Sequence, residues 1–283
     1  METHLFQTTR GEIRGLSWGC PGAPFVLAVH GGFGVAENFI EIGEHLGENY
    51  RVLALDLPGR GKSFWSANPE RDYRLPVFAD LIREIIDELG VEKLCWIGTS
   101  MGGVLGIHAA SGPLAGRVTH LVMNDIGPTL PDELAEPIGR SMGSQPHFLS
   151  LGEVAAYLKT GLGELAGPER DAAFWCAKAA CFARRLPDGG YTLHQDPKIE
   201  SHIVHGRCDF EVWEQFVALP ARIMLIHGWK SSIVTPEIVE RMRVARVDLV
   251  VADYREWGHA PFLDRAEDAL LIDRFFNPGA GVH

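Results

Sequence analysis

Residues 93–106 read KLCWIGTSMGGVLG, and this stretch is the most informative part of the chain for its fold. It holds the pattern G-x-S-x-G at residues 98–102, after an apolar run and before a series of small residues that reaches position 110. The apolar run predicts a buried strand, and the small residues predict a closely packed helix. A serine at such a turn projects above the sheet, so we predict that Ser100 is a nucleophile. The alternative is a glycine-rich turn with an incidental serine.

Apolar runs and helical periodicity alternate on both sides of this stretch. Strands are expected at residues 5–9, 13–18, 24–30, 51–57, 93–97, 118–123, 222–226 and 249–252, and helices at 77–89, 98–110, 236–244 and 263–276. Alternating strands and helices predict an α/β fold with a mostly parallel sheet covered on both faces.

The alternation stops between residues 126 and 216. Ser150 and Glu153 form a capping box that opens one helix, and Pro168 is expected to open a second, which ends before Pro187. We therefore predict a mainly helical cap at 126–216, inserted between two parts of one core, 1–125 and 217–283.

A serine hydroxyl needs a base to become a good nucleophile. His259 follows the last expected strand in the sequence WGHAP, at the start of the final helix. The carboxyl ends of parallel strands share one edge of the sheet, so His259 and Ser100 are expected to meet there. We predict His259 as the base, with a structural turn histidine as the alternative.

Acyl transfer also needs backbone N–H groups that stabilise an oxyanion. Met101 follows the nucleophile and is expected to supply one of them. Gly32, in the sequence HGGF after the strand at 24–30, is expected to supply the other, with Phe33 as the fallback. His30 is expected to be structural.

Four elements together resemble the α/β-hydrolase superfamily: His30-Gly31-Gly32, the turn DLPGRGKS at 56–63, the Ser100 turn and Gly258-His259. The resemblance covers residues 12–277, and it is strongest to bacterial carboxylesterases and C–C bond hydrolases. It implies an eight-stranded, mostly parallel sheet and a cap inserted after the strand that follows the nucleophile's helix. It also implies the chain order serine, acid, histidine.

The acid departs from the usual pattern of this superfamily. Most members carry it after the penultimate strand, where this chain has Ser232, and a serine cannot stabilise an imidazolium as a carboxylate does. Asp125 ends the preceding strand, where some members place their acid, so we predict Asp125. The alternatives are a turn or capping role for Asp125, or an acid at Asp253 or Glu256.

Three aromatic residues, Phe33, Trp229 and Trp257, lie close in sequence to the expected catalytic positions. They are candidates for the wall of an apolar substrate pocket. Packing in the core is the equal alternative for each.

Net charge and cysteine content limit the kinds of partner and compartment that we expect. The formal net charge of −11 argues against nucleic acid and anionic membranes, since few cations are left to neutralise phosphates. The five cysteines form no C-x-x-C pair, which favours free thiols in a reducing compartment. Neither a signal peptide nor a membrane-spanning apolar run is visible in the sequence, so we expect a cytoplasmic protein.

These features predict a serine hydrolase that acts on a small molecule by two-step acyl transfer, with no metal or organic cofactor. A carboxylic ester is the first choice of substrate, and C–C or amide bonds are the alternatives. A non-catalytic small-molecule binder on the same scaffold is the alternative of another class. A homodimer is the alternative to a monomer.

Overall fold

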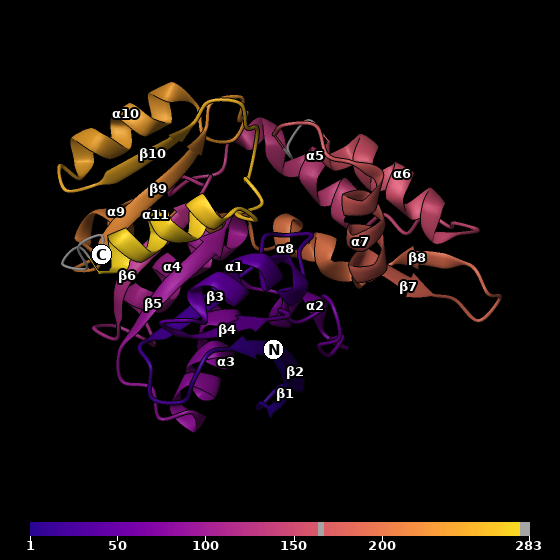
Figure 1. The fold of residues 1–283 in the computed structure, drawn as a ribbon, viewed down its shortest axis with the longest axis horizontal. Helices are drawn as coiled ribbons and strands as arrows, with labels where there is room; N and C mark the ends of the chain where they lie inside the picture. Colours follow the sequence, from indigo (N-terminus) through magenta and orange to yellow (C-terminus); the bar gives the residue numbers. More distant parts are fainter. Residues whose placement is uncertain (164–166, 278–283) are drawn as a thin grey trace.

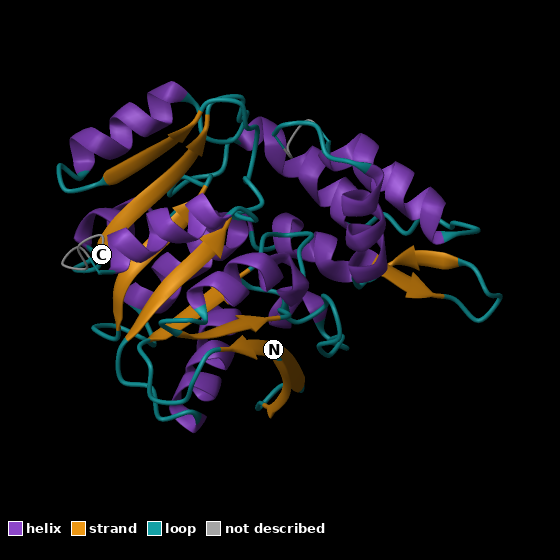
Figure 2. Ribbon diagram, viewed as in Figure 1, coloured by secondary structure: helices purple, strands orange, loops and turns teal. Residues whose placement is uncertain are grey.

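A computed structural model describes residues 1–163 and 167–277 of the chain. Its main sheet has eight strands in the order β1-β2-β4-β3-β5-β6-β9-β10. The pairings of β2 with β1 and with β4 are antiparallel and the other five are parallel, so the predicted eight-stranded, mostly parallel sheet is confirmed (Figure 2). The strands are β1 (Glu2–Gln7), β2 (Glu12–Trp18), β3 (Phe25–Val29), β4 (Arg51–Leu55), β5 (Leu94–Thr99), β6 (Val118–Asn124), β9 (Arg222–Gly228) and β10 (Val250–Tyr254).

Helices cover both faces of this sheet (Figure 1). One face packs against α3 (Leu75–Glu88), α4 (Met101–Ser111) and α10 (Pro236–Ala245), and the other against α1 (Ile40–Leu46) and α11 (Ala266–Phe276). In β3, Leu27 and Val29 join the first apolar cluster, and Val26 and Ala28 join the second. A strand buried on both faces needs apolar residues at every position, which explains the continuous apolar runs in the sequence.

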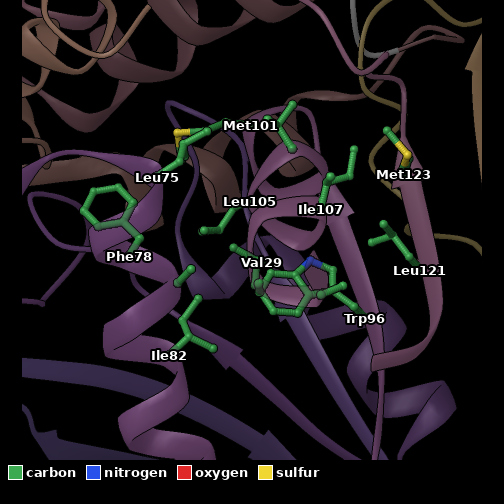
Figure 3. Close-up of a cluster of buried hydrophobic side chains, with 14 of the residues drawn as sticks. Val29, Leu75, Phe78, Ile82, Trp96, Met101, Leu105, Ile107, Leu121 and Met123 are labelled. Atoms are coloured by element: carbon green, nitrogen blue, oxygen red, sulfur yellow. The ribbon is translucent and has the colours of Figure 1, made fainter. Parts of the chain in front are cut away.

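Helix α4 lies buried between α3 and the sheet, with Leu105 and Ile107 in the apolar cluster (Figure 3). The indole N–H of Trp96 in β5 donates to the carbonyl of Gly102 at 3.0 Å. This bond ties the first turn of α4 to the strand before it. The position of the connecting turn is thereby held by the core.

The described part of residues 132–210, between β6 and β9, forms a group of elements beyond the arrowheads of the parallel strands, whereas residues 213–218 pack beside α4 near the start of β9 (Figures 1 and 2). Helices α6 and α7 pack on each other around their own apolar cluster, which includes Leu158, Trp175 and Phe182. The predicted boundary at 125/126 follows β6 directly, whereas that at 216/217 falls inside α9. The elements are α5 (Asp132–Met142), α6 (Leu151–Leu162), α7 (Ala172–Phe182), β7 (Ala183–Arg185), β8 (Tyr191–Leu193), η2 (Pro197–Glu200), α8 (Ser201–Val204), η3 (Arg207–Phe210) and α9 (Trp213–Ala218).

Of the two predicted helix starts in this segment, one agrees with the structure and the other does not. The Ser150 hydroxyl accepts the Glu153 N–H at 3.2 Å and caps α6, as expected. Pro168 does not start α7, which begins at Ala172 because the Asp171 carboxylate accepts the Phe174 N–H at 2.8 Å.

The longest described helix, α3, has 14 residues. A helix needs ~20 apolar residues to cross a bilayer. No helix in the described ranges has the length and apolar character for such a span.

Candidate active site

Ser100 stands at the turn between β5 and α4 with φ 49° and ψ −119°. This conformation lies outside the regions that residues with a side chain normally occupy, so the surrounding structure must hold it. The Ser100 N–H donates to the carbonyl of Asn124 at 2.9 Å, which anchors the turn to the end of β6. The hydroxyl consequently projects from the carboxyl edge of the sheet.

Two glycines make this turn sterically possible. A Cβ atom at Gly98 would lie 2.2 Å from the carbonyl oxygen of Gly102, and one at Gly102 would lie 2.2 Å from the carbonyl oxygen of Val29. Both contacts are with backbone, which has little room to move. The glycines of the G-x-S-x-G pattern are therefore required by close approach of strand and helix.

The structure brings Ser100, His259 and Asp125 into one hydrogen-bonded chain. The Nε2 atom of His259 lies 2.9 Å from the Ser100 Oγ, and its Nδ1 lies 2.8 Å from an oxygen of Asp125. An ionised carboxylate can only accept, so Nδ1 carries the proton and Nε2 is free to accept from the serine hydroxyl. This is the tautomer that a general base needs.

Asp125 is completely buried and has a left-handed φ of 54° just after β6. One carboxylate oxygen accepts the Gly228 N–H at 2.9 Å, and the other accepts the Ala260 N–H at 3.3 Å in addition to His259. These donors compensate for the loss of water around the charge. They also hold the carboxylate in place against the imidazole.

The alternative carboxylates, Asp253 and Glu256, do not contact His259. Asp253 pairs with Nδ1 of His227 at 3.2 Å, and Glu256 is exposed. Ser232, which occupies the usual position of the acid, lies on the wall of the cavity beside Ser100. Among the described carboxylates, Asp125 is the one that contacts His259.

The loop after β3 is held by its carbonyl groups. His30 accepts the Leu57 N–H at 3.0 Å through Nε2, so its Nδ1 carries the proton and donates to the carbonyl of Gly31 at 2.7 Å. The Gly34 N–H donates to the same carbonyl at 3.0 Å. Burial lowers the pKa of His30 to about 4, so the ring is neutral and structural.

This arrangement places the predicted oxyanion donors at the cavity. A peptide unit is planar and trans, so the N–H of Gly32 points away from the anchored carbonyl of Gly31. Within the described ranges, neither the Gly32 N–H nor the Met101 N–H has a protein acceptor. Both residues line the cavity that contains Ser100 and His259.

A cavity of about 470 Å³ lies between the edge of the sheet and the inserted segment. Phe33 lines it, as expected, and none of its described lining residues is Asp, Glu, Lys or Arg. The walls are largely apolar: Phe33, Ile126, Leu130, Leu134, Ile138, Met142, Leu158, Phe182, Ile203, Phe210 and Phe262.

Trp229 and Trp257 do not belong to this wall, in contrast to the expectation. Trp229 is 52% exposed, with the guanidinium of Arg255 4.7 Å from its ring. Trp257 is buried beneath Arg170 and Arg265, whose guanidinium groups lie 5.3 and 5.1 Å from its ring. Proximity in sequence to the expected catalytic positions suggested these rings for the cavity wall, but in the structure both lie outside the cavity and stack against guanidinium groups.

Several residues of the cavity carry no signal in the sequence. Leu134, Tyr157 and Gln195 come from the inserted segment and reach the site only through its packing on the core. Apolar periodicity in that segment is the same for a helix that lines a cavity and for one that packs on a core. Gln195 lies outside any recognisable motif.

Comparison with known proteins agrees with this architecture. A family model described as the alpha/beta hydrolase fold matches residues 24–150. A 3-hydroxybutyrate-oligomer hydrolase of Cupriavidus necator is 31% identical over 273 residues, which cover 91% of this chain and 90% of the relative. The esterase Rv0045c of Mycobacterium tuberculosis is 29% identical over 230 residues, 80% of this chain and 73% of the relative.

Solved structures show the same fold. The crystal structure of an alpha/beta hydrolase from Novosphingobium aromaticivorans matches with a TM-score of 0.85 and 25% identity, over 97% of each chain. The agreement therefore includes the inserted segment as well as the sheet. On the family match and a relative that is similar along nearly its whole length, the chain belongs to the α/β-hydrolase family and is a hydrolase.

Proposed function

We propose that the protein is a serine hydrolase that cleaves neutral carboxylic esters through an acyl-enzyme on Ser100. The observation that carries the proposal is the hydrogen-bonded chain from Ser100 through His259 to Asp125, which borders a cavity with no Asp, Glu, Lys or Arg among its described lining residues. A nucleophile, a base in the correct tautomer and an acid that orients the base are the parts that this chemistry requires.

The proposed reaction has two steps. Nε2 of His259 takes the Ser100 proton while Oγ attacks the ester carbonyl, and the N–H groups of Gly32 and Met101 stabilise the oxyanion. The imidazolium, oriented by Asp125, then protonates the leaving alcohol. Water, activated by the same imidazole, attacks the acyl-enzyme and releases the carboxylic acid and free Ser100.

The cavity supports an uncharged substrate. A carboxylate on the substrate would lose its hydration among apolar walls and would find no cation among the described lining residues. The two curated relatives are named as a 3-hydroxybutyrate-oligomer hydrolase and an esterase, which fits an ester as the scissile group. We infer that this chain takes esters of short acyl chains, including those with a hydroxyl group.

A substrate panel tests the bond that is cleaved. We expect kcat/KM for 4-nitrophenyl butyrate to exceed that for a vinylogous diketone or a butyramide by about 10²-fold or more, since an alkoxide or phenolate leaves more easily than a carbanion or an amide nitrogen. A monoester of succinate should be slower than the butyrate, because its free carboxylate enters the cavity without a partner. Faster cleavage of the diketone or the amide would instead assign the chain to C–C or amide hydrolysis.

Gln195 is the side chain that we expect to recognise a hydroxyl on the acyl chain. It is 1% exposed and lines the cavity, and its amide oxygen accepts no hydrogen bond from the described residues. Gln195→Leu should lower kcat/KM for a 3-hydroxybutyrate ester by about 10-fold and leave the butyrate ester within about 2-fold, in line with the loss of one hydrogen bond. Steady-state kinetics on the two esters measure this ratio. An equal loss on both would mean that Gln195 supports the cavity wall without recognising the hydroxyl.

A further inference from the structure

We propose that the buried guanidinium of Arg60 is a positioning group for the oxyanion loop, residues 31–34, and that its charge stabilises the oxyanion that forms there. His194, from the inserted segment, completes this support. The proposal rests on the serine hydrolase function proposed above and adds the elements that hold its oxyanion site in place.

Arg60 lies in the turn at 56–63 and is completely buried. Its Nε donates to the carbonyl of Gly32 at 3.2 Å, and one terminal nitrogen donates to the carbonyl of Pro58 at 3.0 Å. The other terminal nitrogen lies 3.9 Å from the sulfur of Met101. The guanidinium therefore contacts both residues whose N–H groups we assign to the oxyanion site.

The oxyanion loop needs such external support. Three of its four residues are glycines, which have no side chain to restrict the backbone. Each of its first three carbonyls is held from the protein side: that of Gly31 by His30 and Gly34, that of Gly32 by Arg60, and that of Phe33 by His194. With these carbonyls anchored, the intervening N–H groups keep a fixed direction.

His194 links the inserted segment to this loop. Its Nδ1 accepts the Gly61 N–H at 2.8 Å, so the proton lies on Nε2, which donates to the carbonyl of Phe33 at 3.3 Å. Burial lowers the pKa of His194 to about 4, and the ring stays neutral in this role at pH 7. The turn at 56–63, the oxyanion loop and the inserted segment thus form one connected polar network.

The charge of Arg60 is the second part of the argument. Burial lowers the pKa of Arg60 to about 10, with partial compensation from Tyr73 and Asp196, so the group is charged at pH 7. No carboxylate among the described residues forms an ion pair with it, whereas the nearby Arg14 pairs with Asp56 at 3.0 Å. An unpaired buried cation is costly to fold, and a negative charge that develops close by in a low dielectric offsets that cost.

Two substitutions of Arg60 distinguish the effect of its charge from the effect of its hydrogen bonds to the loop. Arg60→Met removes the charge and keeps an apolar stem, whereas Arg60→Lys keeps the charge and loses the planar fork. We expect kcat on 4-nitrophenyl butyrate to fall about 10²-fold in Arg60→Met and about 10-fold in Arg60→Lys, with KM within about 2-fold, as for the loss of oxyanion stabilisation. The affinity for an alkyl boronic acid, which becomes a tetrahedral anion on Ser100, should fall in proportion to kcat.

Arg246→Met is the matched control. Arg246 is also a buried arginine that donates to backbone carbonyls, here those of Phe216, Leu219 and Ala221, but it lies outside the active site. Its substitution should lower the melting temperature and leave kcat per active site within about 2-fold. Titration of each variant with a fluorophosphonate counts active sites and removes differences that come from the folded fraction alone.

The outcomes are distinct. Unchanged kcat and boronate affinity in Arg60→Met, with Ser100 still essential, would overturn the role of Arg60 and leave the proposed function intact. Wild-type protein that forms no phosphonate adduct on Ser100 would overturn both proposals. If Arg60→Met does not fold, Arg60→Lys and His194→Gln test the proposal in its place. A kcat per active site equal to that of the wild type in both variants would contradict a positioning role.

Discussion

Ser100→Ala is expected to lower kcat/KM for a neutral ester by about 10⁵- to 10⁶-fold, the scale of loss when the nucleophile of a catalytic triad is removed. The residual His259–Asp125 pair has no hydroxyl to activate. The fold should persist, because alanine has a smaller side chain at the same backbone angles and the turn is held by the Ser100 N–H bond to Asn124. Ester hydrolysis and far-UV circular dichroism on the same preparation measure the two effects.

Covalent labelling gives this prediction a second readout. A fluorophosphonate should add one label to the wild-type peptide that contains Ser100, and none to Ser100→Ala. Ser232→Ala serves as the matched control, since Ser232 lines the same cavity and should not be needed for labelling. Persistent turnover in Ser100→Ala would refute the proposed mechanism. Binding of a small ester without its consumption, together with no label, would support the non-catalytic alternative.

Asp125→Asn is expected to lower kcat by about 10⁴-fold, as for other triads in which the acid becomes an amide. Asp125 accepts hydrogen bonds from the Gly228 N–H, from the Ala260 N–H and from Nδ1 of His259. An asparagine has one acceptor oxygen, so with that oxygen on the Gly228 N–H its amide donor would face His259. The imidazole would then carry its proton on Nε2 and could not accept one from Ser100. Steady-state kinetics with active-site titration measure the loss.

Two controls fix the interpretation of this loss. Asp253→Asn alters another aspartate–histidine pair, formed with His227 at 3.2 Å, and should leave kcat within about 2-fold. Ser232→Ala tests the position where the acid usually stands, and we expect a similarly small effect. A large loss in Ser232→Ala with a small one in Asp125→Asn would overturn the assignment of the acid.

The nucleophile and its turn were accessible from the sequence because their constraints are local. Gly98 is needed by its close approach to the Gly102 backbone within one strand-turn-helix unit, so the pattern and its flanking segments appear together in the chain; Gly102 is needed in addition by the Val29 carbonyl of β3. Asp125 was accessible for a related reason. It directly follows a parallel strand, and the carboxyl ends of such strands share one edge of the sheet.

The substrate cavity was not accessible in the same way. Phe33 was expected in its wall and lies there, whereas Trp229 and Trp257 were expected and lie outside it. Those two rings contact the guanidinium groups of Arg255, Arg170 and Arg265, which reach them only in the folded chain. The start of α7 shows the same limit on a smaller scale. Pro168 predicted the start of this helix, but the helix begins at Ala172, where the Asp171 side chain caps it.

The sequence by itself determined the alternating order of strands and helices, the turn that presents Ser100, and the strand ends from which His259 and Asp125 arise. Apolar periodicity and turn preferences depend on residues that are close in the chain, so the sequence alone is enough to predict these elements. Only the tertiary structure decided which side chains wall the cavity, and that Arg60 and His194 converge on the oxyanion loop. Those contacts join segments up to 161 residues apart, and their partners are selected by packing between the inserted segment and the core.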